Sequence, residues 1–283
     1  MHSEKKIIWV SGGYRVHCEF FPCPSPRGTV LMVNGAFATI TSLHHTIKYL
    51  IEQFNVVAFD LPFAGESRVL NPKAAVLEKD KEVAILLDLI NIYEPDFAIS
   101  MSWGGVALLL SLSQRPSSIK RAVLGSFAPE VNPLMRNYLE QSLRFLAADN
   151  HEGAAALFNQ TLGRYLPRLF QRFNERYLLQ FGTHAIDQIL FHIRHVLSMD
   201  LSKYQNVVTE IDLPLMFVNG ERDQFTPADS ITHLQLPRAE IRREIVPEAG
   251  HFLDMEGKVP WRHMRSLLIN YLLEGANVTP EYT

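Results

Sequence analysis

The sequence predicts an α/β protein in which a mostly parallel sheet is flanked by helices and a helical cap is inserted into the chain. Short apolar runs bounded by turn residues alternate with longer helical patterns, as in parallel α/β sheets. Near the start, two alternating apolar runs flank a Ser-Gly-Gly turn, which indicates an antiparallel hairpin. Residues 129–208 carry helical patterns and no convincing strand, which indicates an insertion.

The bulk composition is that of an ordinary globular protein. The 283 residues are 47% hydrophobic and 20% charged, so the chain can bury a sizeable core. A net charge of -3 gives no reason to expect nucleic acid binding. Cys18 and Cys23 are too close in sequence for a useful disulfide, which favours a reducing compartment. No apolar run suits a signal peptide or a membrane span, so we expect a soluble, cytoplasmic protein.

Eight strands and four core helices follow from the apolar pattern. The continuous apolar runs suit strands buried on both faces of a sheet. The predicted strands are residues 7–10, 14–20, 29–33, 55–59, 97–101, 122–125, 215–218 and 243–246. The predicted core helices are residues 42–54, 79–93, 104–113 and 260–273, and Pro260 suits a first helical turn.

The domain prediction divides the chain into a core and one inserted cap. The core comprises residues 1–128 and 209–283, and the cap comprises residues 129–208, between the sixth and seventh strands. A cap inserted there is expected to lie over the carboxyl ends of the strands, where open α/β sheets place their ligands.

A serine nucleophile is predicted at Ser102. The apolar strand 97–101 runs through Ser102 into a glycine-rich helix start, which is the context of a nucleophile elbow. Such a turn needs small residues two before and two after the serine, and here they are Ser100 and Gly104. Ser100 departs from the usual glycine, so a plain strand followed by a glycine-rich helix start is the competing interpretation.

An acid and a histidine follow in the order that this kind of site requires. Asp223 lies in the loop after the seventh strand, with Glu221 and Asp229 as rivals for the role. His251 lies in the loop after the last strand, and none of the other histidines has that context. The imidazole would take the serine proton, and the carboxylate would hold the imidazole in the right tautomer. The joint placement predicts a catalytic triad of Ser102, Asp223 and His251.

The oxyanion donors are expected to be two backbone N–H groups. One belongs to Trp103, and the other belongs to Ala36 or Phe37 in the loop after the third strand, where a plain Asn-Gly turn is the alternative. We expect no metal site, because the adjacent His44 and His45 face different directions on a helix. No prosthetic cofactor is expected either.

These motifs identify a resemblance along the whole chain. The chain resembles the α/β-hydrolase-fold acyltransferases of bacterial rhamnolipid synthesis, in which a serine also stands two residues before the nucleophile. It is almost as similar to a sister group of 3-hydroxyacyl transacylases and thioesterases. The resemblance rests on Val33-Asn34-Gly35-Ala36, Phe54-Asn55-Val56-Val57, Asp60-Leu61-Pro62-Phe63-Ala64-Gly65, Ser102-Trp103-Gly104-Gly105, Phe127-Ala128-Pro129 and Gly250-His251-Phe252-Leu253-Asp254.

The resemblance implies an activity and its partners. An enzyme of the first group joins two (R)-3-hydroxyacyl units, delivered by acyl carrier protein, into a 3-(3-hydroxyalkanoyloxy)alkanoate through an acyl-enzyme. The alternatives are a thioesterase, a transacylase that passes the acyl group to coenzyme A and, more remotely, a non-catalytic ligand-binding protein with this fold.

Pocket and docking residues are also predicted. The substrate pocket is expected to include Asn34, Phe63, Phe158 and Phe173, with aromatic cap residues excluding water and sheathing the acyl chain. Four arginines recur every fourth residue and predict either a docking stripe for the acidic carrier protein or a solvated helix face, although Pro167 interrupts the pattern. They are Arg164, Arg168, Arg172 and Arg176.

Overall fold

The centre of the fold is one eight-stranded sheet. The computed structural model describes residues 2–36, 38–72, 76–180, 182–198 and 202–274. Strand order is β1-β2-β4-β3-β5-β6-β7-β8, with β1–β2 and β2–β4 antiparallel and the pairs from β4–β3 to β7–β8 parallel. The strands are β1 (Glu4–Val10), β2 (Tyr14–Phe21), β3 (Thr29–Val33), β4 (Asn55–Phe59), β5 (Phe97–Met101), β6 (Arg121–Gly125), β7 (Leu215–Gly220) and β8 (Ile241–Val246). The predicted fold class is confirmed.

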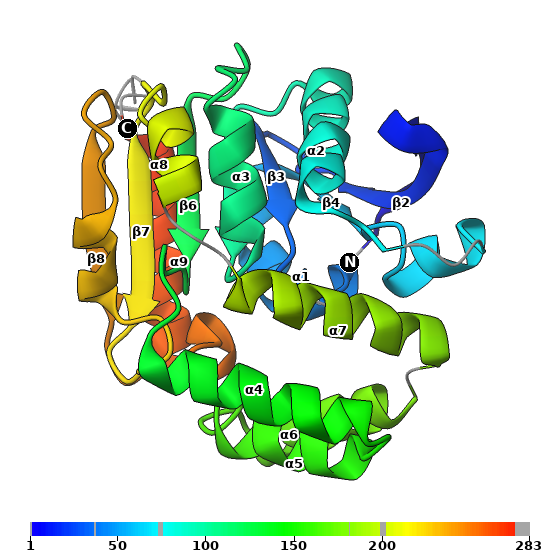
Figure 1. Cartoon of the computed structure of the whole chain (residues 1–283). Coiled ribbons are helices and arrows are strands. Elements are labelled where there is room, and N and C mark those ends of the chain that lie inside the picture. Colours follow the sequence, from blue (N-terminus) through cyan, green and yellow to red (C-terminus); the bar gives the residue numbers. More distant parts are fainter. Residues whose placement is uncertain (1, 37, 73–75, 181, 199–201, 275–283) are drawn as a thin grey trace.

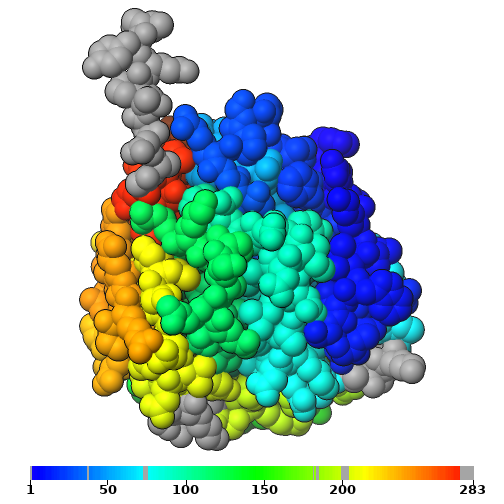
Figure 2. All heavy atoms as spheres, turned by 90° about the horizontal axis from the view of Figure 1, so that it is seen from above, coloured from blue at the N-terminus to red at the C-terminus, as the bar shows by residue number. Residues whose placement is uncertain are grey.

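Helices cover both faces of this sheet. One face carries α2 (Lys79–Tyr93), α3 (Gly104–Leu112) and α8 (Ser202–Val208), and the other carries α1 (Ile40–Leu50) and α9 (Lys258–Leu273) (Figure 1). Because successive side chains of a strand point to opposite faces, Leu31 packs in the cluster under α2 and α3, whereas Met32 packs in the cluster under α1 and α9. Seen from above, α8, α3 and α2 lie side by side between the β8 edge and the β1–β2 edge (Figure 2).

The inserted segment between β6 and β7 is helical. It comprises α4 (Pro133–Ala147), α5 (His151–Gln160), α6 (Arg168–Leu179) and α7 (Thr183–Leu197), which lie beyond the carboxyl ends of the parallel strands (Figure 1). Leu139, Leu146, Ala154 and Ile189 build a separate apolar cluster in these helices. In contrast, α8 packs on α3 and buries Val208 in the main core, so by its contacts α8 belongs with the sheet rather than with α4–α7.

Cys18 and Cys23 are both buried and carry free thiols. Among the described residues, no helix combines the length and apolar character needed to span a membrane.

Candidate active site

Ser102 stands in a tight turn between β5 and α3. Its backbone is left-handed, with a φ of 50°, which is uncommon outside glycine and favours a functional explanation. The Ser102 N–H donates to the carbonyl oxygen of Gly125 at 2.7 Å, which ties the turn to β6. A Cβ atom at Gly104 would overlap with the carbonyl oxygen of Asn34, so only glycine fits two residues after the serine. Ser100, two residues before it, is fully buried.

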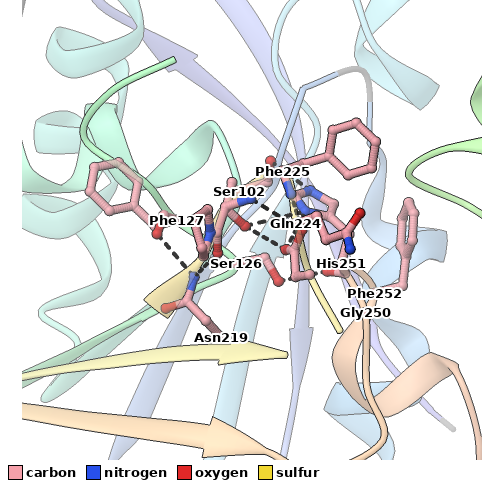
Figure 3. A network of polar contacts seen from close by, with 12 residues as sticks. Ser102, Ser126, Phe127, Asn219, Gln224, Phe225, Gly250, His251 and Phe252 are labelled. Atoms are coloured by element: carbon pink, nitrogen blue, oxygen red, sulfur yellow. Dashed lines mark hydrogen bonds and ion pairs between the residues drawn. The ribbon is translucent and has the colours of Figure 1, made fainter. Parts of the chain in front are cut away.

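His251 and Asp223 complete a hydrogen-bonded chain that begins at Ser102 (Figure 3). His251 Nε2 lies 3.1 Å from Ser102 Oγ, and His251 Nδ1 lies 2.8 Å from Asp223 Oδ2. The structure therefore brings the three predicted residues together in the geometry of a nucleophile, a base and an orienting acid. The rivals lie elsewhere, because Glu221 accepts from the Glu248 N–H at 2.8 Å and Asp229 is exposed on a 3-10 turn.

The surroundings of Asp223 keep its carboxylate ionised. Burial raises its pKa, but the charge and hydrogen bond of His251 and the hydrogen bonds from Thr226 outweigh burial and bring the pKa to about 2. Oδ1 accepts the N–H groups of Phe225 at 2.9 Å and Thr226 at 3.1 Å, and the Thr226 hydroxyl donates to Oδ2. At neutral pH the acid therefore presents a fixed negative charge to the imidazole.

Two buried side chains and one half-buried side chain hold the loops that carry the acid and the base. Ser126 Oγ donates to the carbonyl oxygen of His251 at 2.6 Å. Asn219 Nδ2 donates to the carbonyl oxygens of Phe127 at 3.1 Å and Thr226 at 2.7 Å (Figure 3). Glu256 accepts the N–H groups on either side of His251, those of Gly250 and Phe252. The sequence analysis missed all three because their roles depend on which loops meet in space.

The predicted oxyanion donors border the site. Trp103 immediately precedes α3, and the N–H groups at a helix start have no acceptor within the helix. The positive end of the helix dipole also favours negative charge there. Ala36 lies in the loop after β3 and lines the same pocket as Trp103. Phe37 lies outside the described residues.

A pocket opens beside these groups and runs beneath α7. It encloses about 640 Å³, open solvent included, and its walls are mostly apolar. Of the predicted pocket residues, Asn34 and Phe63 line it. Phe158 instead packs edge-on against Phe252 at 5.7 Å, and Phe173 is 56% exposed on α6. Tyr177 of the same helix lines the pocket in place of Phe173.

A buried charged pair lies at the edge of this pocket. Lys79 forms an ion pair with Glu82, and Lys79 Nζ lies 4.4 Å from the centroid of the Trp103 ring. Burial lowers the pKa of Lys79, and Glu82 opposes this shift. His192 also contacts the indole, with ring centroids 4.6 Å apart, and burial holds its pKa well below the usual value. The side chain next to the nucleophile is thus clamped between α2 and α7.

The four arginines of the predicted docking stripe are all exposed. Pro167 ends the turn before α6, so Arg164 lies outside the helix while the other three follow one another at four-residue spacing on α6. Helix α6 buries none of its residues, and Leu169 on it is 76% exposed. Among the described residues, no group of three or more His, Cys, Asp or Glu side chains is placed to hold a metal ion.

A serine at a strand-to-helix elbow, with an acid and a histidine after later strands of a parallel sheet, defines a known class. The chain belongs to the α/β-hydrolase-fold family, whose model matches residues 28–258.

The most informative relatives share most of the chain. Proteins named (R)-3-hydroxydecanoyl-ACP:CoA transacylase are 41% identical in Pseudomonas aeruginosa and 36% identical in Pseudomonas putida. The alignments cover 96% of this chain in both cases, and 91% and 92% of those proteins respectively. These names agree with the sister group of transacylases.

Solved structures agree on the fold. The α/β hydrolase MGS-M2 from a deep-sea metagenome has a TM-score of 0.76 at 14% identity, covering 94% of this chain and 96% of its own. The enol-lactonase of Burkholderia xenovorans has a TM-score of 0.75 at 13% identity, covering 95% of this chain and 100% of its own.

Proposed function

We propose that this protein is a serine acyltransferase that takes an (R)-3-hydroxyacyl group from the thioester of an acyl carrier protein. The observation that carries the proposal is the hydrogen-bonded chain from Ser102 through His251 to Asp223, at the edge of an apolar pocket. The names of the relatives supply the substrate class, since they combine a 3-hydroxyacyl group with a carrier protein.

In the first half-reaction, His251 takes the proton of Ser102 as its oxygen attacks the thioester carbonyl carbon. The Trp103 N–H and a second N–H, from Ala36 or Phe37, would stabilise the oxyanion of the tetrahedral intermediate. When the C–S bond breaks, His251 returns its proton to the leaving sulfur. The products are a free carrier thiol and an acyl ester on Ser102. The carrier's phosphopantetheine is part of the substrate, so the residues themselves supply the chemistry.

In the second half-reaction, an acceptor loses its proton to His251 and attacks the carbonyl carbon of the acyl ester. The bond to Ser102 Oγ then breaks, and His251 returns the proton to that oxygen. If the acceptor is the 3-hydroxyl of a second hydroxyacyl unit, an ester forms between the two units. Hydrolysis of the second unit's own thioester then gives a 3-(3-hydroxyalkanoyloxy)alkanoate, the lipid precursor of rhamnolipids. The motif Asp60-Leu61-Pro62-Phe63-Ala64-Gly65 supports this acceptor through the resemblance to the rhamnolipid enzymes. A transferase of this kind must keep water from the acyl ester. Helix α7 lines the pocket and would help to exclude water from it.

The second candidate acceptor is the thiol of coenzyme A. The names of the relatives favour it directly, because they describe transfer from carrier protein to coenzyme A. Triad geometry is the same for both acceptors and for water, so the acceptor is decided by binding and not by the triad.

The carrier protein is proposed to dock on the exposed basic face of α6. Arg168, Arg172 and Arg176 recur at helical spacing there, with exposed apolar side chains between them. Carrier proteins of this kind are acidic, so opposite charges would steer and orient the encounter.

The test is mass spectrometry of the products formed from purified (R)-3-hydroxydecanoyl carrier protein, with and without coenzyme A, with Ser102→Ala as the control. A Ser102-dependent product of two hydroxyacyl units joined by one ester supports the rhamnolipid-type reaction. A 3-hydroxydecanoyl-coenzyme A product supports the transacylase. Free 3-hydroxydecanoate as the sole product would contradict transfer and leave a thioesterase, and no turnover of any kind would contradict the enzyme and favour a binding role.

A further inference from the structure

A second, smaller hollow is lined by the base and the acid and shares no lining residue with the acyl pocket. It encloses about 270 Å³, open solvent included. Asp223 and His251 form part of one wall, and Leu162 and Tyr165, from the turn between α5 and α6, form part of the other. The larger pocket, in contrast, is bordered by Trp103 and the loop after β3. The reacting carbonyl would therefore lie between two separate spaces.

Two guanidinium groups are gathered at this hollow around a single aromatic ring. Arg164 Cζ lies 5.3 Å and Arg222 Cζ lies 5.7 Å from the centroid of the Tyr165 ring, and both arginines line the hollow. The Tyr165 ring is itself anchored beside the base, because a Cβ atom at Gly250 would stand only 2.6 Å from a ring carbon. The two cations thus lie near the loop that carries His251.

Neither arginine has a carboxylate partner in the described part of the chain. The arginine ion pairs found there involve Arg115, Arg121, Arg238, Arg242 and Arg265. The acids around the hollow are already engaged. Asp223 is bonded to His251 and Thr226, Glu256 accepts the N–H groups of Gly250 and Phe252, and Glu221 accepts that of Glu248.

The two guanidinium groups at this ring repel each other. An anion bound between them is attracted by both, and this attraction offsets the repulsion. Guanidinium groups are the side chains best suited to phosphate, since their planar N–H forks match its oxygens. The hollow also lies beside His251, which protonates the leaving sulfur in the proposed reaction. The leaving sulfur of the substrate and the two guanidinium groups would therefore lie along one path from His251 to solvent.

We propose that this hollow receives the phosphopantetheine arm of the thioester and that Arg164 and Arg222 bind its phosphate. The inference rests on the proposed function and deepens it. The acyl chain would enter the larger pocket while the arm leaves through the hollow past Tyr165. Because carrier protein and coenzyme A share this arm and its phosphate, one site would serve the donor thiol and, in a transacylase, the acceptor thiol in turn.

The experiment compares two small thioesters that differ only in the phosphate: (R)-3-hydroxydecanoyl-4′-phosphopantetheine and (R)-3-hydroxydecanoyl-pantetheine. The readout is the ratio of their kcat/KM values for release of free thiol. We expect the wild-type ratio to be about 10 or more, since charge-assisted contacts to a phosphate are strong. In the double variant Arg164→Ala/Arg222→Ala the ratio should fall toward one. The double variant Arg164→Lys/Arg222→Lys should keep part of the preference for the phosphorylated thioester. Arg262→Ala, an exposed arginine on α9, should keep the wild-type ratio.

A binding measurement separates this inference from the proposed function. Calorimetric titration of the same proteins with 4′-phosphopantetheine and with pantetheine needs no turnover. A phosphate-dependent affinity that is lost in the double variant supports the site even if no thioester reacts. Equal affinities for the two compounds in the wild type, or a phosphate effect that survives in the double variant, would overturn it. Absence of Ser102-dependent thiol release would count against the proposed function instead.

Discussion

The Ser126 hydroxyl donates to the carbonyl oxygen of His251 at 2.6 Å, so the end of β6 holds the loop that carries the base. Ser126 also adopts a left-handed backbone, with a φ of 48°, as Ser102 does at the neighbouring strand end. Two adjacent strands thus each end in a strained serine, one as the candidate nucleophile and the other as a support for the base.

Replacing Ser126 by Ala should lower kcat about tenfold or more, because a base displaced by even about 1 Å loses much of its effect. The unpaired carbonyl should also cost about 1–3 kcal/mol in the free energy of unfolding. Kinetics and urea unfolding of the same preparation check both. The matched control is Ser111→Ala, a buried serine bonded to the Ala107 carbonyl oxygen at 2.9 Å within α3, which should lose stability without the loss of kcat. An equal effect of both variants on kcat would contradict the role of Ser126.

Acid stability should depend on Asp223. Its folded pKa of about 2 lies below the ordinary value of 3.8, so its ionised form stabilises the fold above about pH 4, and this contribution is lost as the pH falls toward about 2. The contribution at neutral pH is about 2 kcal/mol. Between pH 6 and pH 3, the free energy of unfolding measured in urea should therefore fall more steeply for the wild type than for Asp223→Asn. Parallel curves for the two proteins would show that Asp223 is not the group responsible.

Gly104→Ala should disrupt the site through the loop after β3. The added Cβ atom would overlap with the carbonyl oxygen of Asn34, and overpacking of this kind costs about 1–3 kcal/mol. The displaced loop carries Ala36, so turnover should fall with stability. Gly182→Ala is the control, because a Cβ atom there meets no atom within 4 Å. Wild-type kinetics in Gly104→Ala would contradict the close approach of helix and loop.

The buried pair of Lys79 and Glu82 should behave as a unit. Lys79→Met or Glu82→Leu alone leaves an unpaired buried charge and should cost about 3–5 kcal/mol, whereas the double variant should recover most of this loss. A double-mutant cycle from thermal or urea unfolding gives the coupling free energy between Lys79 and Glu82. Additive single effects would show that the two charges do not compensate each other.

The basic face of α6 should matter for the carrier protein and not for small thioesters. Charge reversal at Arg168, Arg172 and Arg176 should reduce by about tenfold or more the ratio of kcat/KM for the carrier-bound thioester to that for the phosphopantetheine thioester. The remaining activity with the carrier should also respond less to salt. Arg262→Glu, at an exposed position of α9, is the control for each single reversal on α6. A ratio that the triple variant leaves unchanged would place the docking surface elsewhere.

Much of the fold could be predicted because parallel strands leave a strong local signal. All eight strands and the bounds of α2 follow from apolar runs and turn residues. The signal is strongest for β3 to β7, because strands buried on both faces are almost continuously apolar. The triad was also predictable, because in this architecture each of its members follows a particular strand, and the order of strands along the chain is readable.

The residues that were missed share a physical reason. Ser126 and Asn219 act across loops that are far apart in sequence, and Lys79 and Glu82 look like an ordinary solvated pair at three-residue spacing until the fold buries them. Phe173 was predicted to line the pocket, yet it stacks on Tyr177 at the surface. An amphipathic pattern in a cap helix identifies an apolar face without saying what that face covers.

The chain leaves the sheet at β6 and re-enters it at β7, and these two strands are direct partners, with Gly125 opposite Val218. The segment that contains α4–α7 therefore begins and ends at neighbouring strands. Ser102, Asp223 and His251 all lie on loops outside this segment. Helices α4–α7 can therefore differ between proteins of this family without any change in the loops that carry Ser102, Asp223 and His251.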